Sequence, residues 1–236
     1  MDWLDRTKLL LGEEKLVKLA SSHVLVAGLG GVGAYAAEQL CRAGVGTISI
    51  VDNDIINLTN INRQLIALNS NLNRPKVEVL AERLQDINLQ VKVYQHNIFL
   101  KDENMLQILD NKYDYVIDAI DTLSPKIYLI KLCVEKGIPI VSSMGSGGKT
   151  NPESVKISDI SKSYNCSLAR ILRKRLHRLG IYKGIDVVFS SEKADKSSVV
   201  LEESENKKSN VGTISYMPAI FGCFAASVVI RNLCEI

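Results

Sequence analysis

The sequence lacks paired cysteines. Its five cysteines form no Cys-x-x-Cys pair and are odd in number: Cys41, Cys133, Cys166, Cys223 and Cys234. This pattern argues against a disulfide framework and against a four-thiolate zinc site, so we expect no zinc and a reducing, cytoplasmic environment. Four of the thiols occupy apolar helical stretches and are expected in the core, whereas Cys166 is expected nearest to solvent.

A strong charge of either sign is also missing. The chain has 29 basic and 26 acidic side chains and a formal net charge of +3, which is too small to predict nucleic-acid binding by itself. The beginning, MDWLDRTKLL, is charged and has no apolar signal core, so no secretory signal is expected. Residues 211–230 are long and uncharged, but Tyr216 and Pro218 interrupt them. We expect a strand and a buried helix there, and no membrane span.

Short β-branched runs alternate with helical stretches through the first part of the chain. The expected strands are 23–28, 47–52, 91–95, 113–118 and 138–143, and a helix is expected over 4–20, with Leu9, Leu10, Leu16, Val17 and Leu19 forming its apolar stripe. We expect Asn73 and Ser124 to cap the helices that follow them and Gly137 to end one. This alternation predicts a Rossmann-like, doubly wound α/β fold with a mainly parallel sheet.

The rhythm changes after residue 150. A strand over 153–157, a basic helix over 168–179, a strand over 185–189 and a polar, mobile loop near 190–210 are expected. We therefore divide the chain into a nucleotide-binding region, 1–150, which includes the N-terminal helix, and a smaller mixed α/β substrate-handling and dimer-contact region, 151–236. With 236 residues, both fit in one globular unit.

A glycine-rich turn follows the first expected strand and opens a helix. Gly28, Gly30 and Gly33 satisfy G-x-G-x-x-G, and Gly31 opens the turn further. Backbone N–H groups at such a helix start bind phosphates, and Asp52, at the end of the next strand, suits a ribose. The motif predicts a dinucleotide or ATP site without deciding between them.

The segment after Asp52 favours a triphosphate. It is long and polar, and it brings Arg63 and then Lys76 toward the same pocket, where two cations can hold phosphates as pyrophosphate leaves. Asp118 and Asp121 follow the fourth strand, where a carboxylate holds Mg²⁺ or simply caps a turn. An NAD-dependent oxidoreductase and a nucleotide-binding module without chemistry stay open at this stage.

Four segments in order, GLGGVG, DNDIINLTNINRQ, RPK and DAIDT, resemble the ubiquitin-activating-enzyme-like superfamily, whose members adenylate carboxylates. The resemblance implies that Asp52 binds the ATP ribose, that Arg63 and Lys76 contact phosphates and that Asp121 positions Mg²⁺. It also implies a homodimer in which Arg6, within RTKLLLG, reaches the partner's site. The expected nucleotide-binding residues are Gly28, Gly30, Gly31, Gly33, Asp52, Asp54, Asn60, Arg63, Gln64 and Lys76, and the expected catalytic residues are Arg63, Lys76, Asp121 and Arg6.

Further segments, among them YVIDAIDTLSPKIYLI, IPIVSSMGSGGK and ISDISKSYNCSLARILRKRL, are similar to the tRNA threonylcarbamoyladenosine dehydratase branch of that superfamily. This resemblance implies ATP-dependent activation of a carboxylate on a modified adenosine in tRNA, followed by cyclisation. Zinc-bearing relatives that activate small sulfur-carrier proteins have paired Cys-x-x-Cys motifs, which this chain lacks. Activation of a carrier protein, with Cys166 taking the acyl group, is the alternative.

The basic helix is the candidate contact for tRNA. It carries six basic or ionisable side chains with no acid among them: Arg170, Arg173, Lys174, Arg175, His177 and Arg178. Such density is typical of phosphate binding. The alternative is a solvated face on a helix whose Ile171, Leu172, Leu176 and Leu179 pack inward.

Overall fold

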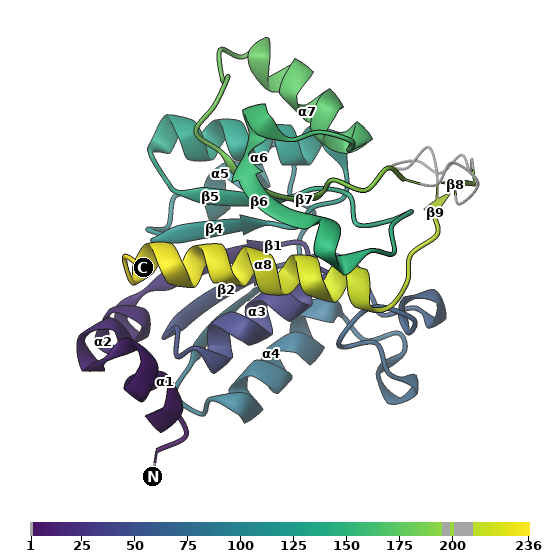
Figure 1. Cartoon of the computed structure of the whole chain (residues 1–236). Helices are drawn as coiled ribbons and strands as arrows, with labels where there is room; N and C mark the ends of the chain where they lie inside the picture. The colour runs from purple at the N-terminus through teal and green to yellow at the C-terminus, as the bar shows by residue number, and fades with distance from the viewer. Residues whose placement is uncertain (1, 195–198, 201–209) are drawn as a thin grey trace.

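A single twisted sheet organises the protein (Figure 1). The computed structural model describes residues 2–194, 199–200 and 210–236. Within them, seven strands lie in the order β3-β2-β1-β4-β5-β7-β6, and β8 pairs with β9 in a separate two-stranded sheet. The strands are β1 (His23–Ala27), β2 (Thr47–Val51), β3 (Lys92–His96), β4 (Tyr115–Asp118), β5 (Ile140–Ser143), β6 (Val155–Asp159), β7 (Asp186–Ser190), β8 (Val199–Val200) and β9 (Asn210–Val211).

Neighbouring strands are parallel from β3 to β7, and β6 alone runs antiparallel, against β7. The chain winds outward from β1 in both directions, so its order reverses between β1 and β4. This switch point is where open α/β sheets bind ligands, at the carboxyl ends of the strands. The doubly wound α/β fold expected from the sequence is confirmed.

Helices cover both faces of the sheet. They are α1 (Asp5–Leu11), α2 (Glu13–Ser21), α3 (Gly33–Arg42), α4 (Lys76–Ile87), α5 (Asp102–Ile108), α6 (Leu123–Lys136), α7 (Ser167–His177) and α8 (Tyr216–Leu233). Val24 and Val26 of β1 pack into the core under α3, α4 and α8. Leu25 and Ala27 point the other way, into the core under α5, α6 and α7, because successive strand residues face opposite sides.

The last helix is the stretch whose composition first suggested a membrane span. By length and apolar composition α8 is long enough to cross a membrane. In the structure it lies across the sheet and packs against α3, burying Met217, Phe221 and Val229. Val211 ends β9 and Pro218 falls in the first turn of α8, so the predicted strand and buried helix are confirmed.

The N-terminal prediction was wrong in two respects. The expected single helix is broken at Gly12, whose φ of +85° is left-handed, and α1 and α2 result. Of the expected apolar stripe, Leu19 is buried, whereas Leu9 and Leu10 are 87% and 82% exposed. The break redirects α1, so that Leu11 still packs against the core while Leu9 and Leu10 face solvent.

The two predicted helix caps were also wrong. Asn73 has a φ of +65° and lies before the helix, and Pro75 precedes the first residue of α4. Ser124 lies inside α6, which begins at Leu123 without a side-chain cap. Gly137 does end α6 in the left-handed conformation, as predicted. The polar loop expected over 190–210 falls partly outside the described residues.

Candidate functional site

The glycine turn joins β1 to α3 at the switch point. A side chain on Gly33 would place its Cβ 1.8 Å from the Gly28 carbonyl oxygen, and one on Gly28 would meet the Ala119 oxygen at 2.8 Å. These two glycines therefore let the helix and strands approach closely. The space beside Gly31 is occupied by Pro218 of α8, because a Cβ added to Gly31 would lie 2.9 Å from that side chain.

Gly30 differs from its neighbours because the space beside it is open. The nearest atom to an added Cβ is Nε2 of Gln64, at 3.8 Å. Gln64 is buried, and its Oε1 has no hydrogen-bond partner in the described residues. A buried amide oxygen without a hydrogen-bond partner lowers the stability of the fold. A side-chain amide can also be turned over, so that it offers a ligand either its oxygen or its nitrogen. Gly30 and Gln64 together fit a polar ligand such as a nucleotide phosphate.

Asp52 lies between the glycine turn and the following loop. Its Oδ2 accepts from the Leu29 N–H at 2.6 Å, and its Oδ1 accepts from the Asp54 N–H at 2.8 Å. Burial raises the pKa of Asp52, although the Lys76 charge and the two backbone bonds oppose that effect. Each carboxylate oxygen keeps a second lone pair, which is the acceptor that a ribose hydroxyl needs.

Lys76 is buried at the start of α4, and its Nζ donates to Asp54 Oδ2 at 2.8 Å. The backbone reinforces this contact, because the Lys76 N–H bonds to the Asp54 carbonyl at 3.0 Å. Asp54 was predicted as a nucleotide ligand. In the structure it holds Lys76, whose ammonium has three donors and so can serve a phosphate as well.

Arg63 and Asn60 sit on the loop after β2. Arg63 Nη1 donates to the Thr59 carbonyl at 2.9 Å and to Asn62 Oδ1 at 2.7 Å. Asn60, a predicted ligand, is buried, and its Oδ1 accepts from the Asn57 N–H at 3.0 Å. Asn60 thus stabilises the short 3-10 helix Leu58–Asn60. This helix fixes the backbone that leads to Arg63.

The two aspartates after β4 have different surroundings. Asp118 is fully buried: Lys126 Nζ and Ser142 Oγ both donate to its Oδ2 at 2.6 Å, and its Oδ1 accepts from the Ile120 N–H at 3.1 Å. Asp118 therefore caps a turn, one of the two alternatives that the sequence left open. Asp121 is exposed beyond that turn at the carboxyl edge.

Sequence reasoning missed Lys126 and Ser142. A signal was available, because Lys126 stands at the front of the apolar run IYLI in α6, where a buried lysine needs a carboxylate partner. Among the described residues, no three His, Cys, Asp or Glu side chains gather as a metal site. Mg²⁺ at Asp121 would therefore depend on phosphate oxygens for other ligands.

Arg6 is not brought to this edge by its own chain. It lies on α1, and Leu4, at the start of that helix, packs against Gly44, three residues before β2 begins. That is the amino-terminal edge of the sheet, opposite the glycine turn. Within one chain, α1 and Arg6 therefore lie away from the edge that carries the glycine turn.

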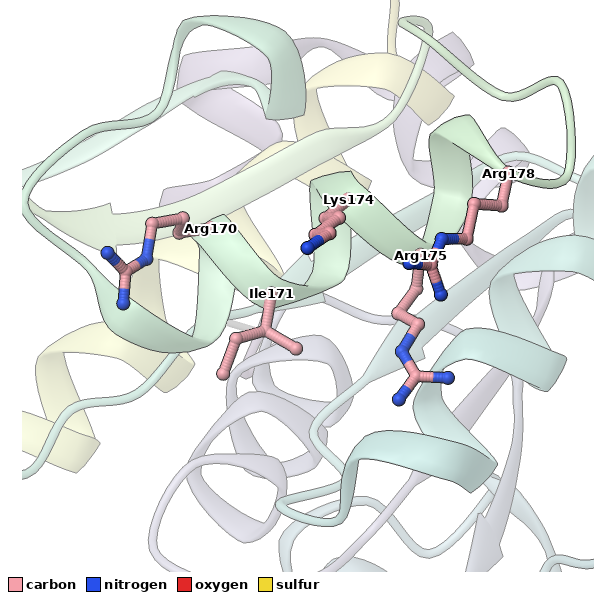
Figure 2. Close-up of a pocket in the computed structure, with 5 residues that line it drawn as sticks. All are labelled: Arg170, Ile171, Lys174, Arg175 and Arg178. Carbon is pink, nitrogen blue, oxygen red and sulfur yellow. The ribbon is translucent and has the colours of Figure 1, made fainter.

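Four predicted tRNA contacts share one surface of α7. Arg170, Lys174, Arg175 and Arg178 line a surface pocket together with Ile171 (Figure 2). Leu172 and Leu176 are buried as predicted, but Ile171 and Leu179 are exposed, which corrects that part of the prediction. Arg173 differs from the four, because its Nη1 donates to the Ser163 carbonyl at 2.7 Å and anchors the helix.

The prediction for the thiols was wrong at two positions. Cys166 is buried at the start of α7, where its sulfur accepts from the Ala169 N–H at 3.5 Å. Cys223, expected in the core, is exposed on α8. All five cysteines are free. A buried thiol that caps a helix is poorly placed to take an acyl group from a bulky partner.

These features define a class of protein. A doubly wound sheet with a glycine turn at its switch point, against which the backbone of Arg63 lies, defines a Rossmann-like protein of the nucleotide-binding kind. More narrowly, the chain belongs to the ThiF family, whose profile matches residues 4–236.

Individual relatives match over most of the chain. The tRNA threonylcarbamoyladenosine dehydratase of Bacillus subtilis is 44% identical over 203 residues, which are 86% of this chain and 78% of the relative. The Escherichia coli tRNA N6-threonylcarbamoyladenosine dehydratase, TcdA, solved in complex with ATP, superposes with a TM-score of 0.90 at 36% identity, covering 98% of this chain and 93% of that one. Its complex with AMP gives 0.89 at 35% identity and the same coverage. The family resemblance expected from the sequence is confirmed.

Proposed function

We propose that this protein is an ATP-dependent tRNA threonylcarbamoyladenosine dehydratase. The observation that carries the proposal is the similarity to such enzymes along nearly the whole chain, including a relative that binds ATP and AMP. The open space beside Gly30, the buried Gln64 amide oxygen without a partner in the described residues, and the Lys76 charge acting on Asp52 support a nucleotide at the switch point.

The reaction begins with a carboxylate that is a poor electrophile. The threonine carboxylate of the modified adenosine attacks the α-phosphorus of ATP, the bond to the β-phosphate oxygen breaks, and pyrophosphate leaves. Arg63, Lys76 and the Gly30 turn hold the phosphates and offset the developing charge. Asp52 holds the ribose. Asp121 would help to hold Mg²⁺, which would further neutralise the phosphate charge.

The acyl-adenylate then closes on itself. The carbamoyl group of the same nucleoside attacks the activated carbonyl and expels AMP, so the nucleoside loses one water in total. The protein's task in this step is to orient the two groups and exclude water. No protein nucleophile is required, which agrees with the buried position of Cys166.

We assign two contacts outside the nucleotide pocket to partners. Arg170, Lys174 and Arg175 of α7, together with Arg178 just after it, bind tRNA phosphates. The exposed Leu9 and Leu10 of α1 support a homodimer in which Arg6 of one subunit reaches the site of the other. The substrate-handling region is residues 151–236, and five free cysteines support a cytoplasmic location.

The test is the mass of the product nucleoside. Protein incubated with ATP, Mg²⁺ and tRNA carrying the threonylcarbamoyl mark is expected to release AMP and lower the nucleoside mass by one water. Lys76→Ala is expected to abolish both signals, whereas Lys131→Ala, on the exposed side of α6, keeps them. An unchanged nucleoside mass with the unaltered protein rejects the proposal.

The alternative, adenylation of the C-terminal carboxylate of a small carrier protein, requires a different acceptor. If Cys166 formed an obligatory thioester, Cys166→Ala would lose turnover. Full turnover of tRNA by Cys166→Ala excludes that route and leaves cyclisation within the nucleoside.

A further inference from the structure

An exposed aromatic pair stands at the carboxyl end of α7. The ring of Tyr182, in the loop that follows the helix, lies 5.1 Å from the ring of His177, centroid to centroid, and is tilted by 44°. Tyr182 is 61% exposed, and His177 is exposed too. A large aromatic side chain with more than half of its surface in water has surface available for a ligand.

The loop holds Tyr182 in place from both sides. The Ile181 N–H bonds to the Leu176 carbonyl at 3.0 Å, and Ile181 packs against the core below α6 and α7. On the other side the Gly184 N–H donates to Asp159 Oδ2 at 2.6 Å. Gly184 and Gly180 have φ values of +91° and +78°, which permit these turns. Because the neighbouring backbone is already fixed, binding to the ring costs little ordering entropy.

The surroundings of this pair are cationic. Arg175 lies on the last turn of α7 and Arg178 follows that helix. Both line the surface pocket shown in Figure 2. Lys183 is the next residue after Tyr182. Aromatic rings that stack on bases, next to cations that hold the backbone, are the combination that binds unpaired nucleotides.

We propose that Tyr182 and His177 form a stacking platform for an unpaired base of the RNA substrate, with Arg175 and Arg178 holding the flanking phosphates. This rests on the proposed function, because it takes tRNA as the substrate. Phosphate contacts alone attract any nucleic acid, whereas a platform selects a segment whose bases are free to leave the stack. The platform thus directs a single-stranded loop of the substrate to the α7 side of the sheet.

The experiment compares the dissociation constant for tRNA across a salt series. Tyr182→Ala is expected to weaken binding about tenfold or more at every salt concentration, because stacking on one base is lost. The slope of log K against log salt stays unchanged, since no phosphate contact is removed. Tyr182→Phe keeps the ring and is expected to bind like the unaltered protein. Arg178→Ala, in contrast, lowers the slope by about one.

The chain offers a matched control. Tyr94 on β3 is 51% exposed and its ring lies 5.8 Å from that of His23, tilted by 41°. Tyr94 and His23 are thus a second tyrosine–histidine pair. Tyr94 lies on the edge strand β3, at the other end of the sheet from β7 and β6. Tyr94→Ala is expected to leave tRNA affinity and its salt slope unchanged.

Each outcome decides something. If Tyr182→Ala binds tRNA as tightly as Tyr94→Ala while Arg178→Ala loses slope, the stacking platform is rejected and the phosphate contact stands. If Tyr182→Phe loses as much affinity as Tyr182→Ala, the hydroxyl and not the ring makes the contact, which also rejects stacking. If the unaltered protein neither binds tRNA nor changes its nucleoside mass, the proposed function itself fails.

Discussion

Lys126 shows how a single buried charge is tolerated. Its ammonium and the Asp118 carboxylate are both fully buried, 2.6 Å apart, and Ser142 completes the network. The three side chains come from α6, β4 and β5, so the network ties the turn before Asp121 to two neighbouring elements. Removing either Lys126 or Asp118 leaves an uncompensated charge in the core.

We predict that Lys126→Met lowers the free energy of unfolding by about 3–5 kcal/mol, because Asp118 is left buried without its counter-charge. Chemical denaturation measures the change. The control is Lys131→Met on the same helix, whose ion pair with Glu135 faces solvent and contributes about 0–1 kcal/mol. Equal losses in the two variants would contradict the assignment of a buried ion pair to Lys126.

At the scale of elements, α3 and α4 are joined by Glu38. Its carboxylate accepts from Arg42 Nε at 2.8 Å on its own helix and from Arg83 Nε at 2.5 Å on α4. Burial of Glu38 opposes ionisation, but the bonds from Arg83 and Arg42 outweigh it and lower the pKa of the carboxyl. The charged form is therefore the one that fastens the two helices.

A depressed pKa fixes the direction of the pH effect. Glu38 contributes stability above the pKa of an unfolded glutamate, and that contribution is lost as the pH falls through the lower, folded value. We predict that Glu38→Gln destabilises by about 1 kcal/mol at pH 7, since both arginines are half exposed and screened. The difference in stability between the variant and the unaltered protein, measured by thermal unfolding, is expected to become smaller toward acid pH. A difference that stays constant to pH 3 would show that the charge is irrelevant.

The glycine turn makes a second prediction at this scale. Gly33→Ala would bring a methyl group within 1.8 Å of the Gly28 oxygen, which is backbone and cannot move aside. We expect a loss of stability above about 2 kcal/mol and a displaced turn. Gly30→Ala, where the added methyl group has space, serves as the comparison. It is expected to keep the melting temperature while weakening ATP binding, measured by calorimetry.

At the scale of the whole molecule, Arg6 and Lys76 lie at opposite edges of the sheet. In the proposed homodimer each active site takes Lys76 from one subunit and Arg6 from the other. We predict that Arg6→Ala and Lys76→Ala are each inactive alone, and that mixing them restores about a quarter of the activity, because half the dimers are mixed and each has one complete site.

Subunit exchange must be verified for that mixture, by mass analysis of differently tagged chains. No recovery in a verified mixture would mean that Arg6 does not act across the dimer. A further whole-molecule control is Leu9→Glu, which is expected to separate the subunits without lowering stability, because Leu9 is unburied within the chain.

Much of the fold was predictable because it depends on local sequence patterns. The β-branched runs gave the positions of β1, β2, β4, β5 and β7 to within two residues, and the glycines marked where β1 turns into α3. Predictions that depended on long-range packing failed. Leu9 and Cys223 are exposed and Cys166 is buried because of where each helix lies against the sheet, which no local pattern encodes.

The sequence by itself determined the strand, glycine turn and helix at residues 23–42 and the order of charged residues that follows them, because turn chemistry and periodicity act over a few neighbouring positions. Only the tertiary structure decided the partners of those charges. It buried Asp118 against Lys126 and left Asp121 exposed, although the two aspartates stand three positions apart. The physical reason is that desolvation depends on what packs around a carboxylate, and Ser142 and Lys126 reach Asp118 from other elements.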